Sequence, residues 1–503
     1  MPLDSEKKRL EARLLDLLQR ALEERNRTGI VSTSLELGAL YVSGDLYDKA
    51  EESFRRVLEE PGSRLARAEE RAQAEVGFAQ VTLRRGHLTL AREALERAEK
   101  HLTGPHEVLL DVRNVQCERD LHAGLYRDVV DSIEATLARE TAETLGDARI
   151  DFMVLEGRAR HLLGRNRQAQ RLLEKALELA QSSGYEPGSA NARSELGALM
   201  TTIGQFKLAL EHLEEAVRSG EGMGSQYRLD RDRRRLAWLF LRMGRWEDGE
   251  SLLRRSYESS RDLRTLENRL GSQLGRAQLL ALRGVLEEAG DIALDAMEVA
   301  RAAGYVRRQV QGLLLLGGIA FDAGELDEAL ESLKQAEAVY APIAPESSLM
   351  VQIQAAIGRV LDARKESAEA FERLMRALNL ARETGNVYER HRIDSYLGVH
   401  FGREGEQEKA AGVLSQAASE LGGLGAKYDV AVTRLWFAQL LANRRPMAAA
   451  DRQREMKLAR SNLFEARRLF EPMGAEPRLA EVREAEAKVH QEPAPSSENA
   501  AES

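Results

Sequence analysis

The chain has 503 residues, of which 43% are hydrophobic, 5% aromatic and 31% charged. The 73 Lys and Arg residues and 82 Asp and Glu residues give a net charge of −9, which disfavours nucleic acid as a partner, because such proteins usually present a basic face. Many Ala and Leu residues with few aromatics favour packed helices over a β-sandwich. The single cysteine, Cys117, excludes an intramolecular disulfide framework and a multi-cysteine metal site.

The N-terminus is charged from the fourth residue, so it lacks the apolar core of a signal peptide. No apolar run approaches the roughly 18 residues that span a bilayer. With only one cysteine, a reducing compartment is expected. The sequence therefore predicts a soluble protein of the cytoplasm with no membrane association.

Residues 5–27 carry an apolar stripe at helical spacing, including Leu10, Leu14 and Leu17, and are expected to form a helix that the loop RTG ends. We expect four parts in the chain. They are an N-terminal capping helix (1–28), a repeat region (29–475), a C-terminal capping helix (476–490) and a disordered tail (491–503).

A small residue recurs about every 40 positions through the repeat region, with successive spacings of 38 to 41. The series is Ala50, Ala91, Val129, Ala169, Ala209, Gly249, Ala289, Ala329, Ala370, Ala410 and Ala450. Twelve residues before each member lies a second small residue: Gly38, Ala79, Cys117, Gly157, Gly197, Ala237, Ala277, Gly317, Gly358, Gly398 and Ala438. The sequence predicts eleven units, each a pair of antiparallel helices that approach closely where side chains are small.

A third position, five residues before the series, is glycine in eight units: Gly86, Gly124, Gly164, Gly204, Gly244, Gly284, Gly324 and Gly405. Glycine there is expected to end the first helix in the left-handed conformation. Prolines such as Pro61, Pro105, Pro187, Pro342 and Pro345 fall between one unit and the next, as does the glycine-rich run 219–225. Neighbouring units must then stack to bury their faces.

Residues 196–217, LGALMTTIGQFKLALEHLEEAV, resemble a tetratricopeptide repeat. Leu196 and Gly197 match its first helix, Gly204 its turn, and Ala209 and Ala216 its second helix. The resemblance extends over about residues 29–475, with a unit of 40 residues rather than the 34 of the common form. It is similar to the long repeats of maltose-regulator-type activators and kinase-linked bacterial modules. It implies an all-α fold, a right-handed α-solenoid superhelix with capping helices at both ends.

In such repeats the first helices line the concave groove. The resemblance therefore places in the groove the residues six, three and two before the small residue of the first helix, and one after it. The candidates for partner binding are Asn191, Arg231, Arg234, Arg235, Trp238, Gln278, Gln311, Arg359, Arg392 and Tyr396, with Ser194, Gln352, Ser395 and Gln439 at equivalent positions. Trp246 and Trp436 are expected to be packing residues.

The run DRDRRRLAWLF (230–240) is the most distinctive local feature. Guanidinium groups pair with carboxylates and an indole provides an apolar anchor, so the run could bind an acidic or C-terminal peptide. Alternatively, these arginines form a solvated face that pairs with Glu and Asp of neighbouring repeats. Both interpretations stay open.

No phosphate-binding loop, zinc helix or nucleophile elbow is present, and the nine histidines are scattered. Cys117, at a small-residue position, is expected to be a buried structural thiol. We therefore expect no catalytic residue, metal or cofactor. The favoured function is a scaffold that binds a partner protein or peptide in bacterial signalling or transcriptional regulation. The alternative is a ligand-sensing regulator, or an enzyme whose carboxylates and histidines converge on one pocket, and the sequence shows no such convergence.

Overall fold

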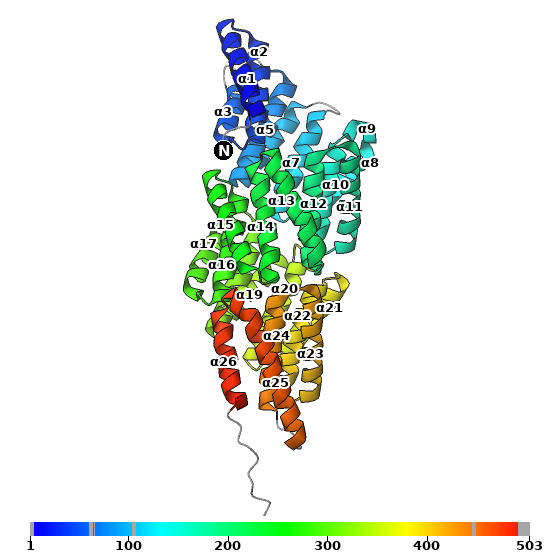
Figure 1. The fold of residues 1–503 in the computed structure, drawn as a ribbon. Helices are drawn as coiled ribbons and strands as arrows, with labels where there is room; N and C mark the ends of the chain where they lie inside the picture. The colour runs from blue at the N-terminus through cyan, green and yellow to red at the C-terminus, as the bar shows by residue number, and fades with distance from the viewer. Residues whose placement is uncertain (1–4, 60–63, 65, 103–106, 445–448, 491–503) are drawn as a thin grey trace, which may run out of the picture.

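The computed structural model describes residues 5–59, 64, 66–102, 107–444 and 449–490, and the regular structure within these ranges is helical, without strands. Eleven helix pairs follow one another along an elongated body (Figure 1), which confirms the predicted all-α solenoid. The first helices of the pairs are α2 (Arg27–Ser43), α5 (Ala68–Arg85), α7 (Glu107–Ala123), α10 (Ala148–Leu162), α12 (Glu186–Ile203), α14 (Gln226–Arg242), α16 (Leu266–Arg283), α18 (Val306–Ala323), α20 (Ser348–Ala363), α22 (Val387–Arg403) and α24 (Lys427–Asn443).

The second helices pack against them on the outside. They are α3 (Tyr47–Leu58), α6 (Leu88–His101), α8 (Tyr126–Arg139), α11 (Asn166–Ser183), α13 (Phe206–Met223), α15 (Trp246–Asp262), α17 (Leu286–Ala302), α19 (Leu326–Tyr340), α21 (Ser367–Glu383), α23 (Gln407–Leu424) and α25 (Ala449–Phe470). Helix α1 (Ser5–Glu23) precedes the first pair, and α26 (Glu476–His490) follows the last after a short 3₁₀ turn (Glu471–Met473). A four-residue helix, α9 (Ala142–Leu145), lies between α8 and α10.

Glycines of the first helices receive a large side chain from the second helix of the same pair. A β-carbon on Gly197 would lie 2.5 Å from Leu213 Cγ and 3.4 Å from the carbonyl oxygen of Ala209. Gly157, Gly317, Gly358 and Gly398 stand in the same relation to the leucine sixteen residues later. The side chain of one helix therefore fills a hole that only glycine leaves open, which is the close crossing that the spacing predicts.

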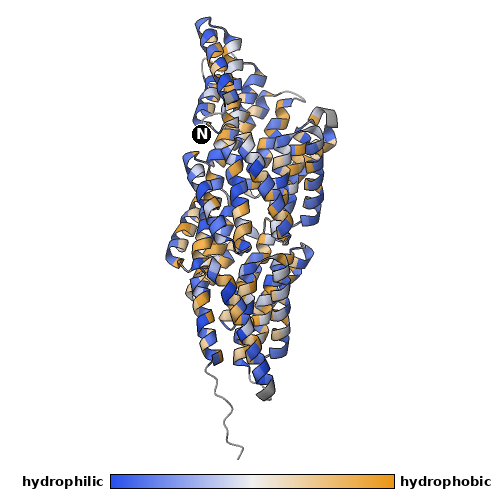
Figure 2. Cartoon of the chain, in the orientation of Figure 1, coloured by the Kyte–Doolittle hydropathy of each residue, from blue (hydrophilic) through white to orange (hydrophobic). Residues whose placement is uncertain are grey.

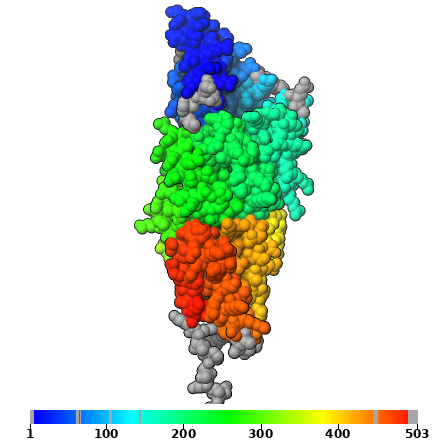
Figure 3. Space-filling view, in the orientation of Figure 1, coloured from blue at the N-terminus to red at the C-terminus, as the bar shows by residue number. Residues whose placement is uncertain are grey.

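The solenoid winds so tightly that each turn touches the next. Helix α5 contacts α16, α7 contacts α18, α12 contacts α22 and α14 contacts α24, so one turn takes five repeats. In the space-filling view, the blue, green and orange parts of the chain lie as stacked bands (Figure 3). The winding therefore encloses an interior that the first helices face.

The glycines that end the first helices hold the turns together. All eight have positive φ, as predicted, and Asp45 and Lys365 adopt the same conformation where glycine is absent. A β-carbon on Gly86 would overlap Leu266, and one on Gly164 would overlap the backbone of Glu346 in the following turn. For Gly324 and Gly405 no atom lies within 4 Å, because no described turn follows them. At Gly86 and Gly164, glycine is therefore required for two reasons: the backbone has a positive φ, and a β-carbon would overlap the next turn.

Hydrogen bonds also join successive turns of the superhelix, close to the loops that connect the two helices of a pair. The carboxylate of Asp45 accepts a hydrogen bond from the backbone N–H of Tyr227 (3.1 Å), and Asn166 Nδ2 donates to the carbonyl oxygen of Thr384 (2.8 Å). Both residues are buried, so these bonds satisfy groups that water cannot reach. They link residues 182 and 218 positions apart in the sequence.

Three local predictions were wrong. The expected loop RTG is the first turn of α2, because Asn26 caps that helix by accepting a hydrogen bond from Gly29 N–H (3.1 Å). Most of the glycine-rich run 219–225 is the last turn of α13, where Gly220 is buried beneath Leu229. Pro187 lies in the first turn of α12, a position that needs no backbone donor.

The C-terminal expectations agree better with the structure. Helix α25 is long, with 22 residues, and α26 follows near the predicted position. Pro61, Pro105 and the expected tail (491–503) lie outside the described residues. No helix of the described ranges is long and apolar enough to cross a membrane, and Figure 2 shows hydrophilic and hydrophobic residues intermingled along the helices.

Candidate binding cavity

The interior of the superhelix contains a cavity of about 480 Å³. The first helices of ten successive pairs, α5 to α24, contribute to its wall, together with Arg478 of α26. Twelve arginines and six carboxylates line it, which leaves a net charge of +6 in a chain whose overall charge is −9. The cavity is therefore a concentrated positive region inside an acidic protein.

All ten residues that the sequence singled out line this one cavity. They are Asn191, Arg231, Arg234, Arg235, Trp238, Gln278, Gln311, Arg359, Arg392 and Tyr396. Gln352 and Ser395 line it as well, whereas Ser194 is buried behind it and bonds Asp232. The repeat register thus brings residues from six helices to one interior surface.

The arginine run of α14 pairs with acids of neighbouring repeats, as the second interpretation expected, but it is buried rather than solvated. Arg235 pairs with Glu195 of the preceding repeat (2.6 Å), and Arg234 lies 3.6 Å from Glu267 of the following repeat. Arg231 pairs with Asp232 at 2.9 Å. The guanidinium groups therefore face the cavity while neighbouring repeats supply part of their counter-charge.

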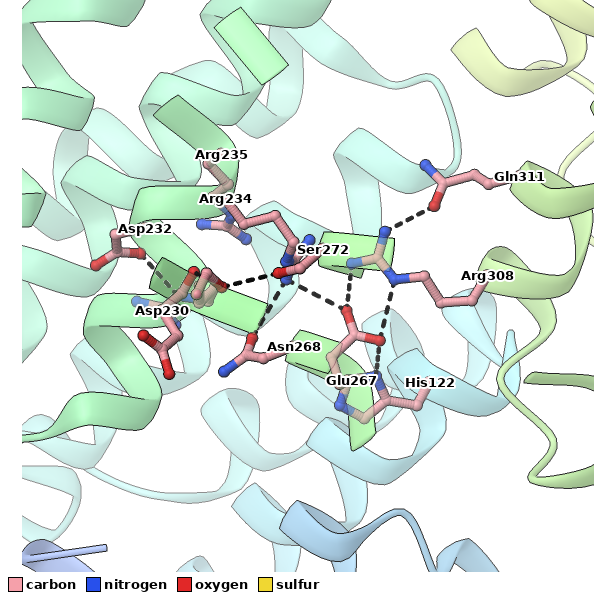
Figure 4. Close-up of polar contacts among 12 residues, drawn as sticks. His122, Asp230, Asp232, Arg234, Arg235, Glu267, Asn268, Ser272, Arg308 and Gln311 are labelled. Carbon is pink, nitrogen blue, oxygen red and sulfur yellow. Dashed lines mark hydrogen bonds and ion pairs between the residues drawn. The ribbon is translucent and has the colours of Figure 1, made fainter. Parts of the chain in front are cut away.

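Glu267 of α16 is the centre of a buried ion network (Figure 4). Its carboxylate accepts hydrogen bonds from Arg308 at 2.5 and 3.2 Å, and it also faces Arg234 and His122. Burial alone would raise the pKa of Glu267, but Arg308, His122 and Arg234 lower it well below its usual range. The two guanidinium groups of Arg308 and Arg234 thus share one carboxylate. The Nε atom of Arg234 has no hydrogen-bond partner among the described residues.

Two histidines on the cavity wall are held neutral. Burial lowers the pKa of His161 to about 3, with Arg307 adding to the effect, and burial lowers the pKa of His122 to about 4. His161 makes one hydrogen bond, between Nε2 and Thr202 Oγ1 at 3.0 Å. At neutral pH these rings add no positive charge to the arginines around them.

The low pKa of His161 predicts acid sensitivity. The unfolded chain takes up this proton near pH 6.5 and the folded chain does not, so folding stability falls as the pH drops from about 6.5 toward 3. Between pH 7.5 and 4.5, we expect His161→Gln to remove about 2 to 3 kcal/mol of this loss. Urea unfolding at the two pH values checks this, and an equal loss in the wild type and the variant would contradict it.

The sequence missed the carboxylates and histidines that converge here. Glu118, Glu195 and Glu267 line the same cavity as His122 and His161, contrary to the expectation that such groups are dispersed. Each of these carboxylates is paired with an arginine: Glu118 with Arg84 (2.9 Å), and the other two as described above. The signal was available, because Glu195 and Arg235 carry opposite charges at the same position of adjacent repeats.

Other arginines of the wall have no carboxylate bound to them. Arg359 lies over the rings of Phe321 (4.6 Å) and Tyr396 (4.7 Å), and Arg242 lies over Tyr388 (4.6 Å). Arg158 and Arg307 have no hydrogen-bonded or ion-paired side-chain partner within the ranges that the structure describes. These groups supply the excess charge of the cavity.

The expected packing residues follow two patterns. Trp246 is fully buried and its indole N–H donates to the carbonyl oxygen of Leu241 (3.1 Å), as expected. Trp436, in contrast, lies on the cavity wall beside Tyr396, with ring centres 5.9 Å apart. Cys117 is buried at a helix crossing, and burial raises the pKa of its thiol.

Comparison with protein families gives one match. Residues 152–221, which comprise most of α10 to α13, match the model of the tetratricopeptide repeat. This part of the chain is a tetratricopeptide-repeat segment. The match includes the stretch whose glycines and alanines carried the resemblance in the sequence. No curated protein matches the chain.

Three solved structures are similar to this chain. One is a Rap protein complexed with competence and sporulation factor, with a TM-score of 0.48, 12% identity, and coverage of 80% of this chain and 99% of that chain. A second is the Cut9–Hcn1 hetero-tetramer of APC/C (TM-score 0.46, 12% identity, 94% and 96% covered). A third is the apo form of the quorum sensor NprR from B. thuringiensis (TM-score 0.42, 14% identity, 70% and 99% covered).

Proposed function

We propose that this protein is a non-catalytic binding scaffold that holds an acidic segment of a partner protein or peptide in its central cavity. The observation that carries the proposal is the charge of the wall, +6 in a chain of −9. Buried arginines without counter-ions are costly, and an anionic partner removes that cost when it binds. The ten residues named from the sequence are its proposed contacts.

Besides positive charge, the cavity wall provides hydrogen-bonding groups and apolar surface for an extended anionic peptide. Arginines pair with carboxylates through two parallel N–H bonds, while Asn191, Gln278 and Gln311 can bond a peptide backbone. Trp238 and Trp436 provide apolar surface at two levels of the wall. A peptide that carries acidic and apolar side chains fits this composition.

Binding is favoured over catalysis because of how the carboxylates are held. Arginines lower the pKa of Glu118, Glu195 and Glu267 despite burial, so these groups are weak bases, and they are engaged in ion pairs. Burial lowers the pKa of His122 and of His161, so both rings are neutral. We propose that the protein acts in the cytoplasm, in a bacterial signalling or regulatory pathway.

A labelled decaglutamate peptide tests the proposal by fluorescence anisotropy with the full chain. Arg228→Gln and Arg359→Gln remove cavity arginines that hold no ion-paired carboxylate, so neither orphans a buried acid. We expect each to weaken binding about tenfold, the value of one hydrogen bond between charged groups. Affinity should also fall as salt is added.

The matched control is Arg261→Gln on the outer helix α15. Arg261 is exposed and pairs with Asp262 at 3.3 Å, outside the cavity. Its substitution should leave peptide affinity unchanged. No binding of the peptide, or the same loss for Arg261→Gln as for the cavity variants, would refute the proposed site.

A further inference from the structure

A second, smaller cavity adjoins the central one among the last helices of the chain. Its volume is about 200 Å³, and it shares Arg359, Tyr396, Trp436 and Arg478 with the central cavity. Phe321 of α18 also lies on its wall, although it does not line the central cavity. In Figure 1, α24 and α26, which carry Trp436 and Arg478, lie at the end of the body away from α1. We refer to this second cavity as the end pocket.

The aromatic rings of the end pocket are joined through one guanidinium group. The guanidinium carbon of Arg359 lies over the ring of Phe321, 4.6 Å from the ring centre, and over the ring of Tyr396 at 4.7 Å. The ring of Trp436 lies beside that of Tyr396, with ring centres 5.9 Å apart. These three contacts bring side chains of α18, α20, α22 and α24 into one cluster.

Arg359 differs from the other arginines of the end pocket, because those are paired with acids. Arg403 pairs with Asp362, and Arg478 pairs with Glu481 at 2.6 Å. Among the residues that the structure describes, Arg359 has no hydrogen-bond or ion-pair partner. Its ring contacts use the face of the guanidinium group, whereas its N–H groups lie in the plane of that group. The N–H groups of Arg359 are therefore available to an acceptor.

The size and the wall of the end pocket fit an aromatic ring. A cavity of roughly 150 Å³ with an apolar wall is enough to hold benzene. Leu374 and Val399 lie on the wall together with the three aromatic side chains. A bound ring would gain from edge contacts with these rings and from the nearby guanidinium groups. An aliphatic side chain would gain from burial alone, so the wall favours an aromatic one.

We propose that the end pocket holds one aromatic side chain of the partner, beside an acidic residue that binds Arg359. The ring packs against Phe321, Tyr396 and Trp436, and the carboxylate accepts hydrogen bonds from the guanidinium group. This subsite rests on the proposed function to the extent that one partner fills both cavities. It adds the kind of side chain that anchors the partner. A row of like charges does not define which residue meets which arginine, whereas one buried ring does.

Two labelled peptides test this subsite by fluorescence anisotropy with the full chain. Both are decaglutamate in which one central residue is replaced, by Trp in one peptide and by Leu in the other. We expect the Trp peptide to bind about tenfold more tightly than the Leu peptide. Phe321→Leu and Trp436→Leu should each reduce this ratio to about two or less, because each removes a ring contact. Both affinities come from the same variant, so a general loss of stability affects them alike.

Arg359→Lys keeps the positive charge and removes the planar guanidinium group. We expect it to lower the ratio as well, because lysine lacks the flat group that stacks on rings. Phe464→Leu on α25 serves as the control, since Phe464 is 63% exposed and lines neither cavity. Its ratio should equal that of the wild type. A ratio near one in the wild type, or the same ratio in the wild type and in both ring variants, would overturn the subsite.

Indole, which carries no charge, distinguishes this subsite from the proposed function. In equilibrium dialysis with the full chain we expect indole to bind, and Phe321→Leu and Trp436→Leu to weaken it severalfold. Indole binding that depends on both rings, with no binding of decaglutamate, would support the end pocket and refute the acidic partner. Binding of decaglutamate without any preference for Trp over Leu would overturn the end pocket and leave the scaffold function standing.

Discussion

Glu267→Gln is expected to lower the free energy of unfolding by about 3 to 5 kcal/mol, because it leaves Arg308 and Arg234 buried without their shared counter-charge. Both guanidinium groups are less than a tenth exposed, so water cannot replace the lost carboxylate. The measurement is urea unfolding followed by circular dichroism. The amide side chain has the same shape as the carboxylate, so packing contributes little to the change.

The matched control is Glu288→Gln. Glu288 pairs with Arg276 at 2.5 Å, and about half of each side chain is exposed. An ion pair of this kind stabilises a protein by about 1 kcal/mol or less. Equal effects of the two substitutions would mean that the Glu267 network is not the buried charge cluster that its contacts indicate.

Glu267→Gln also has an expected effect on binding. It removes one of six carboxylates from the cavity wall, so the net charge of the wall rises. The variant that folds less stably should therefore bind decaglutamate more tightly. This opposite change would show that the wall gives up stability to hold an anion, as functional sites often do.

Gly164→Ala is expected to separate two turns of the superhelix locally. Its φ of +85° disfavours any β-carbon by about 1 to 2 kcal/mol, and the added atom would overlap the backbone of Glu346 in the next turn. Overlap with backbone cannot be relieved by a side-chain rotation, so we expect a further cost of about 1 to 3 kcal/mol. Urea unfolding gives the total.

Gly324→Ala isolates the contact between turns from the backbone conformation. Gly324 has the same φ of +85°, and no atom lies within 4 Å of the position of its β-carbon. It should cost only the conformational part. If both substitutions cost the same, the stacking of turns at Gly164 contributes nothing to stability, and the cavity is not held closed there.

The sequence predicted what depends on the repeat itself. The spacing of small residues identified the close helix crossing at Gly197 and the left-handed glycines, because each is decided within one pair of helices. The same register placed Arg231 and Gln311 on the interior surface. Extended to Gly157, the rule that selected Arg359 and Trp238 also selects Arg158.

Contacts between turns were not predictable from the repeat. Gly164 and Glu346 are 182 residues apart, and they meet only because small rotations accumulate over five repeats. The pairing of Asn166 with Thr384 depends on the same accumulated rotation. A periodic sequence pattern does not define the rotation between successive repeats accurately enough to predict which repeats meet. The closed interior and its buried carboxylates were therefore found only from the structure.

Hydrogen–deuterium exchange of the full chain, with and without decaglutamate, tests the central claim most directly. The claim is that the partner enters the interior that the first helices enclose. We expect slower exchange in inner helices such as α14, α18 and α20, with outer helices such as α13 and α15 unchanged. Two results would contradict the claim. One is slower exchange in the outer helices alone, and the other is unchanged exchange throughout the protein although the peptide is bound.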